Sequence, residues 1–339
     1  MIAINRRILL ASRPTGTASA ENFRLESVPT PQPDEGQVLV RHHYLSLDPY
    51  MRGRMSDAKS YAEPQPLGEV MVGGTVGEVV ASRDPGFVAG DLVVGMGGWQ
   101  EFSVVDVRTP GQLRKVDAAR IPLSAYLGVV GMPGVTAWYG LNKICEPTSG
   151  ETVVVSAASG AVGGVVGQLA KQQGCRVVGI AGGRDKCDYV VRELGFDACV
   201  DYKAAADAKA FYALMKAATP DGVDGYFENV GGMILDVLLA RMNAFGRIAL
   251  CGVIAGLNGQ SLALQNTRLI LVSRLKIQGF IVAEHLEHWP RALSELAAGV
   301  AAGRIRYRES VAVGIENAPQ AFFGMLKGRN FGKQLVKLI

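Results

Sequence analysis

Hydrophobic residues in the first third of the chain fall in short, β-branched runs separated by Gly, Pro and an Asp-Pro-Gly turn. Such closely spaced runs are typical of a compact β barrel or sandwich. We therefore expect residues 1 to about 125 to be rich in strands. The runs that predict these strands cover residues 36–47, 69–82, 90–96 and 99–105.

The pattern changes near Tyr126, where apolar runs of strand length begin to alternate with segments of helical periodicity. Strands are expected at 151–157, 175–181, 198–202, 223–230, 246–254 and 276–282. Helices are expected at 161–174, 184–195, about 204–218, 233–243, 269–275 and 288–303. Alternating strands and helices indicate right-handed crossovers and a parallel, doubly wound sheet. The last segment, from residue 304, returns to strand, helix and strand, and could complete either domain.

Composition limits the function classes that fit. The chain has 339 residues, 48% of them hydrophobic, which suits about two domains. Its net charge of +4 is not gathered into a basic run, so nucleic acid is an improbable partner. No apolar run reaches the length of a membrane span or a signal-peptide core, and we expect a cytoplasmic protein. Five cysteines without a C-x-x-C pair argue against a disulfide framework.

A glycine-rich loop, Ala158 to Gly163, follows a predicted strand and opens a predicted helix. This context raises the pattern above a chance match. Gly160 would let the backbone approach a pyrophosphate at the helix N-terminus, and Gly163 would let the helix pack closely on the strand. Ala158 stands where the common fingerprint has its first glycine. The alternative is a tight turn that binds no ligand.

The next strand ends in AGGRDK, residues 181–186, where an NAD-binding domain usually has an acidic residue. Gly182 and Gly183 leave room there for a 2′-phosphate, and Arg184 and Lys186 offer cations to neutralise it. The sequence therefore predicts NADP(H) as the cofactor. The alternative is that both cations merely decorate a helix start, although cations oppose the helix dipole at that end.

Small or amide-bearing residues recur at three further strand ends: ENVGG (228–232), CGVIAG (251–256) and GFIV (279–282). Ligands of open parallel sheets bind beyond the carboxyl ends of the strands. We therefore expect Asn229 and Gly231 to contact a ribose or the nicotinamide.

Taken together with DPYMR (48–52) and GRNFGK (328–333), these motifs resemble the medium-chain dehydrogenase/reductase superfamily, and within it the zinc-independent, NADP-dependent alkenal/one oxidoreductase branch. The resemblance covers almost the whole chain. It implies an α/β protein with a GroES-like, β-rich catalytic domain (1–125 with 304–339) and a Rossmann NADP-binding domain (126–303), commonly a homodimer. It also implies hydride transfer from NADPH to the β-carbon of an α,β-unsaturated ketone or aldehyde.

The resemblance also assigns the residues that hold the cofactor. Gly160, Ala161, Val162 and Gly163 would contact the pyrophosphate, Lys186 the 2′-phosphate and Tyr202 the adenine-side ribose phosphate. The rest of the cofactor would lie along Asn229, Cys251, Phe280, Val282 and Asn330.

Hydride transfer depends chiefly on positioning, but a donor must stabilise the enolate oxygen that develops. Tyr50 of DPYMR is the candidate catalytic residue in the substrate pocket; the alternative is an aromatic side chain that only packs. Relatives usually carry a tyrosine in the loop after CGVI, where this chain has Leu257. We therefore expect a more apolar pocket and draw no substrate preference from the family.

Three other functions remain to be weighed. A zinc alcohol dehydrogenase is disfavoured because no cysteine precedes Cys145 and no histidine stands beside Glu69 of LGEV. His42 and His43 would point to opposite faces of a strand, and His285 and His288 lack a third ligand. We expect no metal. Quinone reduction and a non-catalytic NADPH-binding sensor stay open. The sequence does not separate these two from enone reduction.

Overall fold

The computed structural model describes residues 4–109, 111–260 and 262–339 and divides into two compact units. The first unit comprises Met1–Gly128 and Glu309–Ile339, and the second Val129–Arg308. The domain boundaries predicted from the sequence, after residue 125 and before residue 304, lie a few residues from these divisions. Over the described ranges, no helix is long and apolar enough to cross a lipid bilayer.

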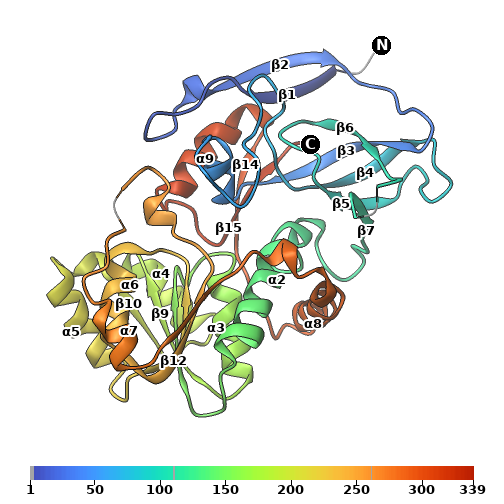
Figure 1. Cartoon of the computed structure of the whole chain (residues 1–339). Coiled ribbons are helices and arrows are strands. Elements are labelled where there is room, and N and C mark those ends of the chain that lie inside the picture. Colours follow the sequence, from blue (N-terminus) through green and yellow to red (C-terminus); the bar gives the residue numbers. More distant parts are fainter. Residues whose placement is uncertain (1–3, 110, 261) are drawn as a thin grey trace. The chain divides into compact units, whose positions relative to one another are not determined.

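The first unit is built on a seven-stranded sheet in the order β14-β15-β3-β4-β5-β7, with β6 also paired to β3. A separate antiparallel hairpin, β1 with β2, lies beside it (Figure 1). The strands are β1 (Ile4–Leu10), β2 (Phe23–Pro29), β3 (Gln37–Ser46), β4 (Thr75–Ser82), β5 (Leu92–Gly95), β6 (Phe102–Asp106), β7 (Leu113–Lys115), β14 (Glu309–Val313) and β15 (Lys333–Lys337). The helices are α1 (Tyr50–Arg54) and α9 (Ala318–Leu326).

The C-terminal segment completes this first unit, which settles the choice that the sequence left open. β15 pairs antiparallel with β3, so strands from both ends of the chain lie side by side, as their red and blue ribbons show in Figure 1. The core between them contains an aromatic cluster. Phe23 stacks on Trp99 at 5.2 Å between ring centroids, and Phe322 of α9 meets Trp99 edge-on at 5.6 Å. These rings join three distant parts of the sequence.

Two details of the first unit differ from the sequence prediction. The run 69–82 forms a strand only from Thr75, because the residues before it cross to the hairpin, where the Met71 N–H donates to the Ile8 carbonyl at 2.9 Å. The hairpin strands β1 and β2 were not predicted. Their exposed faces carry charged residues, so neither reads as an apolar run.

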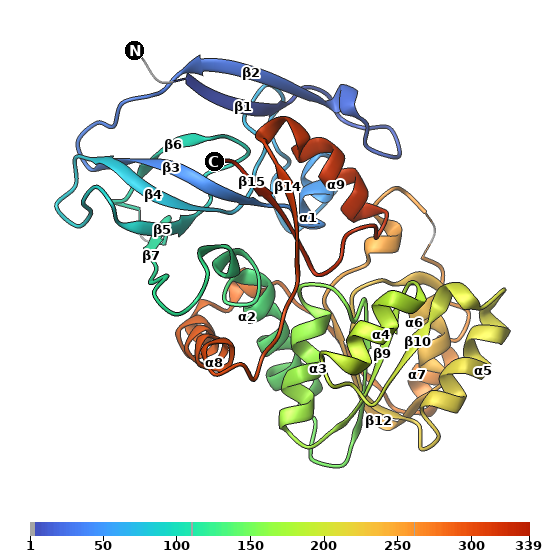
Figure 2. The same cartoon turned by 180° about the vertical axis from the view of Figure 1, so that it is seen from behind.

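The second unit is a six-stranded parallel sheet in the order β10-β9-β8-β11-β12-β13. Helices cover both of its faces (Figure 2). The strands are β8 (Thr152–Ser156), β9 (Arg176–Ala181), β10 (Ala198–Asp201), β11 (Val223–Glu228), β12 (Met242–Leu250) and β13 (Lys276–Gly279). The helices are α2 (Met132–Tyr139), α3 (Gly163–Gln172), α4 (Arg184–Arg192), α5 (Ala208–Ala218), α6 (Gly232–Leu239), α7 (Arg268–Val272) and α8 (Trp289–Ala301). The doubly wound fold predicted from the alternation is confirmed.

One predicted boundary in this unit is wrong. The run 233–243 was expected to be entirely helical, but α6 ends at Leu239 and β12 already begins at Met242. Met242 is buried and pairs with Val223 of β11. Strand pairing and burial thus override the helix preference of the local sequence. The strand also ends earlier than the predicted residue 254: β12 ends at Leu250, which places Cys251 directly beyond the sheet.

A buried ion pair links the two chain segments of the first unit. Lys333, at the start of β15, donates from Nζ to Asp48 Oδ1 at 2.7 Å and to the Leu47 carbonyl at 2.7 Å. The two side chains are 4% and 9% exposed. Asp48 also accepts a hydrogen bond from Ser46 Oγ. The motifs DPYMR and GRNFGK, far apart in the sequence, therefore meet through their charged residues.

We expect Lys333→Met to lower the free energy of unfolding by about 3–5 kcal/mol, because it leaves the Asp48 carboxylate buried without its counter-charge. The double variant Asp48→Asn, Lys333→Met should recover part of that loss. Lys337→Met, at an exposed position of the same strand, should change stability by less than about 0.5 kcal/mol. Urea denaturation would measure all three. Equal effects of Lys333→Met and Lys337→Met would contradict the importance of the pair.

Candidate functional site at the carboxyl edge of the parallel sheet

All six strands of the second unit are parallel, so their carboxyl ends meet at one edge of the sheet. The residues predicted to bind a cofactor in this unit follow those ends. Tyr202 comes after β10, Gly182 after β9, Asn229 after β11, Cys251 after β12 and Phe280 after β13. The glycine loop follows β8 and leads into α3. The fold thus gathers residues spread over more than a hundred positions along a single edge.

The glycine loop is a tight strand-to-helix turn. Ala157 has a left-handed backbone, with φ of 49°, and its carbonyl accepts a hydrogen bond from the Gly160 N–H at 2.9 Å. A β-carbon on Gly163 would lie only 2.5 Å from that carbonyl oxygen, so the close approach requires glycine. Ala158 is fully buried and fits where the common fingerprint has glycine. Ala161 and Val162 complete the turn, and α3 begins at Gly163.

Beyond the end of β9, next to this loop, Tyr202 and Lys203 pack on Gly182. A β-carbon on Gly182 would lie 2.9 Å from Tyr202 Cε1 and 3.0 Å from Lys203 Cε, so a larger residue would displace both side chains. Burial, and then repulsion from Lys203, lowers the pKa of Lys186. Lys186 and Lys203 thus bring two positive charges to one corner of the sheet edge, here called the cationic pocket, and such charges suit a phosphate.

Arg184 lies at the exposed start of α4. Its side chain is 89% exposed and lies 4.0 Å from Asp188, one helical turn along α4. Lys203 is a further cation near Lys186. The sequence analysis missed Lys203 because the turn after β10 brings it back toward β9, a relation that only strand pairing creates.

Asp201 holds this corner of the site together. Its Oδ1 accepts hydrogen bonds from the N–H groups of Gly183 at 2.8 Å and Lys203 at 3.0 Å. Gly183 has φ of 106°, a conformation that favours glycine. A single carboxylate therefore fixes the loops after two neighbouring strands, and with them the lysines that those loops carry.

A buried polar network lies at the ends of β8 and β11. Glu228 is completely buried; its carboxylate accepts hydrogen bonds from Ser156 Oγ at 2.8 Å, from the Tyr226 hydroxyl and from the Val230 N–H. Burial raises the pKa of Glu228, and these donors oppose that rise. Asn229 donates from its side chain to the Ser156 carbonyl at 2.8 Å. The network orients Asn229; Glu228 was missed, although a charge at the end of an apolar strand could have signalled it.

The remaining predicted residues of this unit, at the same edge of the sheet, are a thiol and three apolar side chains. Burial, and then Glu228, raises the pKa of the Cys251 thiol to about 12, so it stays protonated at neutral pH. Phe280 is buried against Tyr139, with ring centroids 5.4 Å apart, and Val282 is also buried. Only their backbones are therefore available to a ligand. Leu257 is half-buried at the end of a short turn.

The other two predicted residues, Tyr50 and Asn330, belong to the first unit. Tyr50 opens α1 directly after the Asp48–Lys333 pair, and it packs against the core cluster that contains Met51. Burial, and then the Asp48 carboxylate, raises the pKa of the Tyr50 phenol well above its usual range. Asn330 donates to the Gly332 carbonyl at 2.8 Å in the turn before β15.

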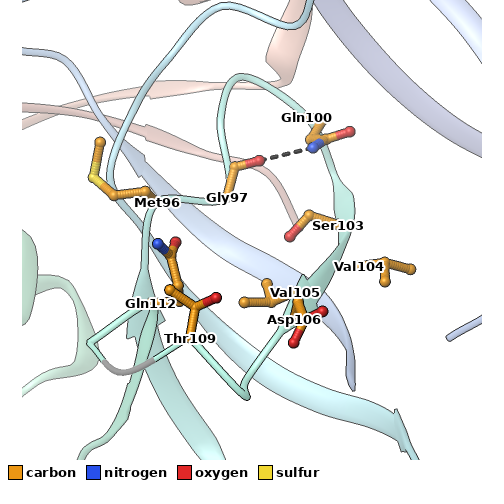
Figure 3. A pocket seen from close by; sticks show the side chains of 9 residues that line it. All are labelled: Met96, Gly97, Gln100, Ser103, Val104, Val105, Asp106, Thr109 and Gln112. Carbon is orange, nitrogen blue, oxygen red and sulfur yellow. Dashed lines mark hydrogen bonds between the residues drawn. The ribbon is translucent and has the colours of Figure 1, made fainter. Parts of the chain in front are cut away.

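The first unit also contains a pocket of about 230 Å³, shown in Figure 3. It is lined by β6 and by residues that follow β5 and precede β7. None of the predicted site residues lines it. Its one carboxylate, Asp106, is engaged by Arg108, which lowers the pKa of that carboxyl to about 2. The lining residues are Met96, Gly97, Gln100, Ser103, Val104, Val105, Asp106, Thr109 and Gln112.

The histidines considered as metal ligands have other surroundings. His42 is buried and hydrogen-bonded through Nε2 to Ser103 Oγ at 2.8 Å, and its neighbour His43 is half-buried, consistent with opposite faces of a strand. His285 stacks on Tyr139 at 4.2 Å between ring centroids. Within the described part of the chain, no three His, Cys, Asp or Glu side chains gather closely enough to hold a metal ion.

Two family models match the chain. Residues 6–115 match the N-terminal domain of oxidoreductases, and residues 161–298 match the zinc-binding dehydrogenase domain.

Several named proteins are similar over nearly their full length. The chain is 46% identical to the NADPH-dependent curcumin reductase of Escherichia coli, covering 98% of this chain and 97% of that protein. It is 43% identical to the NADP-dependent 2-alkenal reductase of Nicotiana tabacum, covering 98% and 97%. Its fold matches the crystal structure of CurA from Vibrio vulnificus in complex with NADPH with a TM-score of 0.92 and 45% identity, covering 98% and 99%.

The crowding at the glycine loop predicts unequal effects of two similar substitutions. In Gly163→Ala the new methyl would meet the backbone of Ala157 at 2.5 Å, which forces the loop to move; we expect a loss of about 1–3 kcal/mol in unfolding free energy. In Gly160→Ala the nearest atom is 3.1 Å away, so a smaller loss is expected. Thermal or urea denaturation would compare them. A larger loss for Gly160→Ala would show that this loop geometry is wrong.

Proposed function

Because the chain belongs to the zinc-independent, NADP-dependent alkenal/one oxidoreductase branch of the medium-chain dehydrogenase/reductase superfamily, we propose that it reduces the C=C bond of α,β-unsaturated ketones and aldehydes with NADPH. The observation that carries the choice of cofactor is the proximity of Lys186 and Lys203 at the sheet edge. The choice of reaction is supported by the similarity to curcumin and 2-alkenal reductases over the whole chain.

The residues present fit this cofactor. The close approach at Gly163 and the two lysines of the cationic pocket suit a pyrophosphate followed by a 2′-phosphate. NADPH supplies the hydride that is added to the substrate's β-carbon. We propose that the chain holds NADPH through Gly160, Ala161, Val162, Gly163, Gly182, Lys186, Tyr202, Lys203, Asn229, Cys251, Phe280, Val282 and Asn330.

These residues would act by binding and orientation. The N-terminus of α3 and the loop N–H groups would hold the pyrophosphate, and Lys186 and Lys203 would distinguish NADPH from NADH. The Ser156–Glu228 network would hold Asn229 in place for the ribose or nicotinamide side of the cofactor. Rigid placement of the reacting atoms is the main source of rate in such a transfer.

Tyr50 is the proposed donor to the developing enolate oxygen. The raised pKa keeps its hydroxyl protonated across the physiological range, as a hydrogen-bond donor requires. The Asp48–Lys333 pair fixes the turn that carries it. Leu257, where relatives usually have tyrosine, would make the pocket more apolar. In this proposal the unit of residues 1–128 and 309–339 is the catalytic domain, and the unit of residues 129–308 binds NADP(H).

Two alternative functions would be recognised by different results in the same assays. A quinone reductase would yield a hydroquinone, whereas an enone reductase yields a saturated ketone or aldehyde. A non-catalytic NADPH-binding protein would bind the cofactor tightly without oxidising it with any enal, enone or quinone.

We further propose a cytoplasmic homodimer whose partner is a small molecule rather than nucleic acid or a membrane. A mass of one chain by light scattering would contradict the dimer.

We expect Lys186→Ala to weaken NADPH binding about tenfold or more, because a charged contact to the 2′-phosphate is lost. The affinity for NADH, which lacks that phosphate, should change by less than about twofold. Arg184→Ala is the matched control, because Arg184 starts the same helix but is 89% exposed. It should leave the affinities for NADPH and NADH nearly unchanged. Oxidation of each cofactor with a panel of enals, enones and quinones would measure KM and identify the product. A native preference for NADH would contradict the phosphate pocket.

We expect Tyr50→Phe to lower kcat by about tenfold to a hundredfold with little change in NADPH affinity, because one donor to the oxyanion is removed. The raised phenol pKa means that the loss should be constant between about pH 6 and 9, since Tyr50 does not ionise there. Steady-state kinetics across that range would test both statements. Unchanged turnover would leave Tyr50 only a packing role.

A further inference from the structure

Two of the five cysteines lie against each other beside the cationic pocket. Cys187 is on α4 and Cys199 is on β10, and their sulfur atoms are 2.9 Å apart. Both are free thiols. Nothing in the proposed binding of NADPH uses either sulfur. The pair could not be predicted from the sequence, because twelve positions separate the two residues.

The geometry of this pair suits a reversible disulfide. A disulfide bond is about 2.05 Å long, so the sulfurs need to approach by only about 0.9 Å. α4 packs directly on β10 and β9, and each thiol also lies near the backbone of Ala181, the last residue of β9. Both cysteines are thus held between neighbouring elements, close enough for a small shift to join them.

The hydrogen bond between the thiols gives them different roles. Cys199 donates to Cys187, and this bond lowers the pKa of Cys187 while it raises that of Cys199. The thiolate is the nucleophilic form of cysteine, so Cys187 is the group that attacks and Cys199 the group that resolves. Cys199 is half-buried and Cys187 is buried, so a small oxidant is required.

The pair is joined through the backbone to the residues around Gly182. Cys187 directly follows Lys186 on α4. Cys199 precedes Asp201 by two residues on β10, and Asp201 accepts the hydrogen bonds that fix Gly183 and Lys203. Drawing the two sulfurs together would therefore shift both lysines relative to the loop between them.

We propose that Cys187 and Cys199 form a redox-sensitive dithiol site that a peroxide converts to a disulfide, which weakens NADPH binding. The Cys187 thiolate attacks one peroxide oxygen, the O–O bond breaks, and with hydrogen peroxide the products are a sulfenic acid and, after protonation, water. The Cys199 sulfur then attacks the Cys187 sulfur, the S–O bond breaks and a second water leaves. Two thiols and one peroxide give one disulfide and two waters; an added dithiol reverses the reaction.

The effect on NADPH rests on the proposed roles of Lys186 and Lys203, whereas formation of the disulfide does not. The test uses the full-length protein treated with hydrogen peroxide and then with an alkylating agent. Trypsin cleaves after Lys186, Arg192 and Lys203, so Cys187 and Cys199 lie on separate peptides, 187–192 and 193–203. Mass spectrometry should find these two peptides joined, and separate again after dithiothreitol.

NADPH affinity is measured by fluorescence on the same samples. We expect the oxidised protein to bind NADPH about fivefold more weakly, the effect of weakening one partly exposed ion pair, with full recovery after dithiothreitol. NADH binding should change less. Binding and oxidation are linked, so the two effects must be equal in size. In a glutathione redox buffer, saturating NADP⁺ should lower the equilibrium constant for disulfide formation by the same factor by which the disulfide weakens NADP⁺ binding.

Three variants make the outcome specific. Cys187→Ser and Cys199→Ser should each abolish the joined peptides and the change in affinity, whereas Cys175→Ser, a buried cysteine at the opposite end of β9, should retain both. Absence of the joined peptides, or a bridge to another cysteine, would overturn the dithiol site. Joined peptides with unchanged NADPH affinity would overturn its effect on the cofactor. If Lys186→Ala leaves the affinity of the reduced protein unchanged, the proposed phosphate pocket fails separately.

Discussion

The buried ion pair between Asp48 and Lys333 is the interaction on which the first unit depends. It joins a turn near the start of the chain to a strand near its end, within a core that excludes water from both charges. Charges buried in this way are tolerated only when they are paired and hydrogen-bonded. The pairing of β15 with β3 and the turn that carries Tyr50 therefore share one anchor.

A second constraint organises the other unit. In a parallel sheet every strand ends at the same edge, so each loop that leaves a strand contributes to one continuous surface. Polar groups that would otherwise be unsatisfied at this edge bind each other. The Glu228 carboxylate accepts hydrogen bonds from the hydroxyls of Ser156 and Tyr226 and from the Val230 N–H. The Asp201 carboxylate accepts hydrogen bonds from the N–H groups of Gly183 and Lys203. These two carboxylates make the edge rigid before any ligand binds.

The corner around Gly182 is crowded and positively charged. Tyr202 and Lys203 pack on Gly182, and burial, followed by repulsion from Lys203, lowers the pKa of Lys186. A dianionic phosphate would relieve this repulsion. The same corner contains the Cys187–Cys199 pair, so the proposed cofactor binding and the proposed thiol chemistry involve the same three elements, β9, α4 and β10.

The sequence by itself determined the features that depend on local chemistry. Periodicity predicted the parallel α/β unit, glycine spacing predicted the strand-to-helix turn, and the missing acid after β9 predicted room for a phosphate. Tertiary structure alone decided which distant residues meet: Lys203 with Lys186, Lys333 with Asp48, Glu228 with Ser156, and Cys187 with Cys199. The reason is physical. Backbone propensity and hydrophobic period act within one element, whereas partners for buried charges and thiols are set by strand order and register, which no short stretch of sequence encodes.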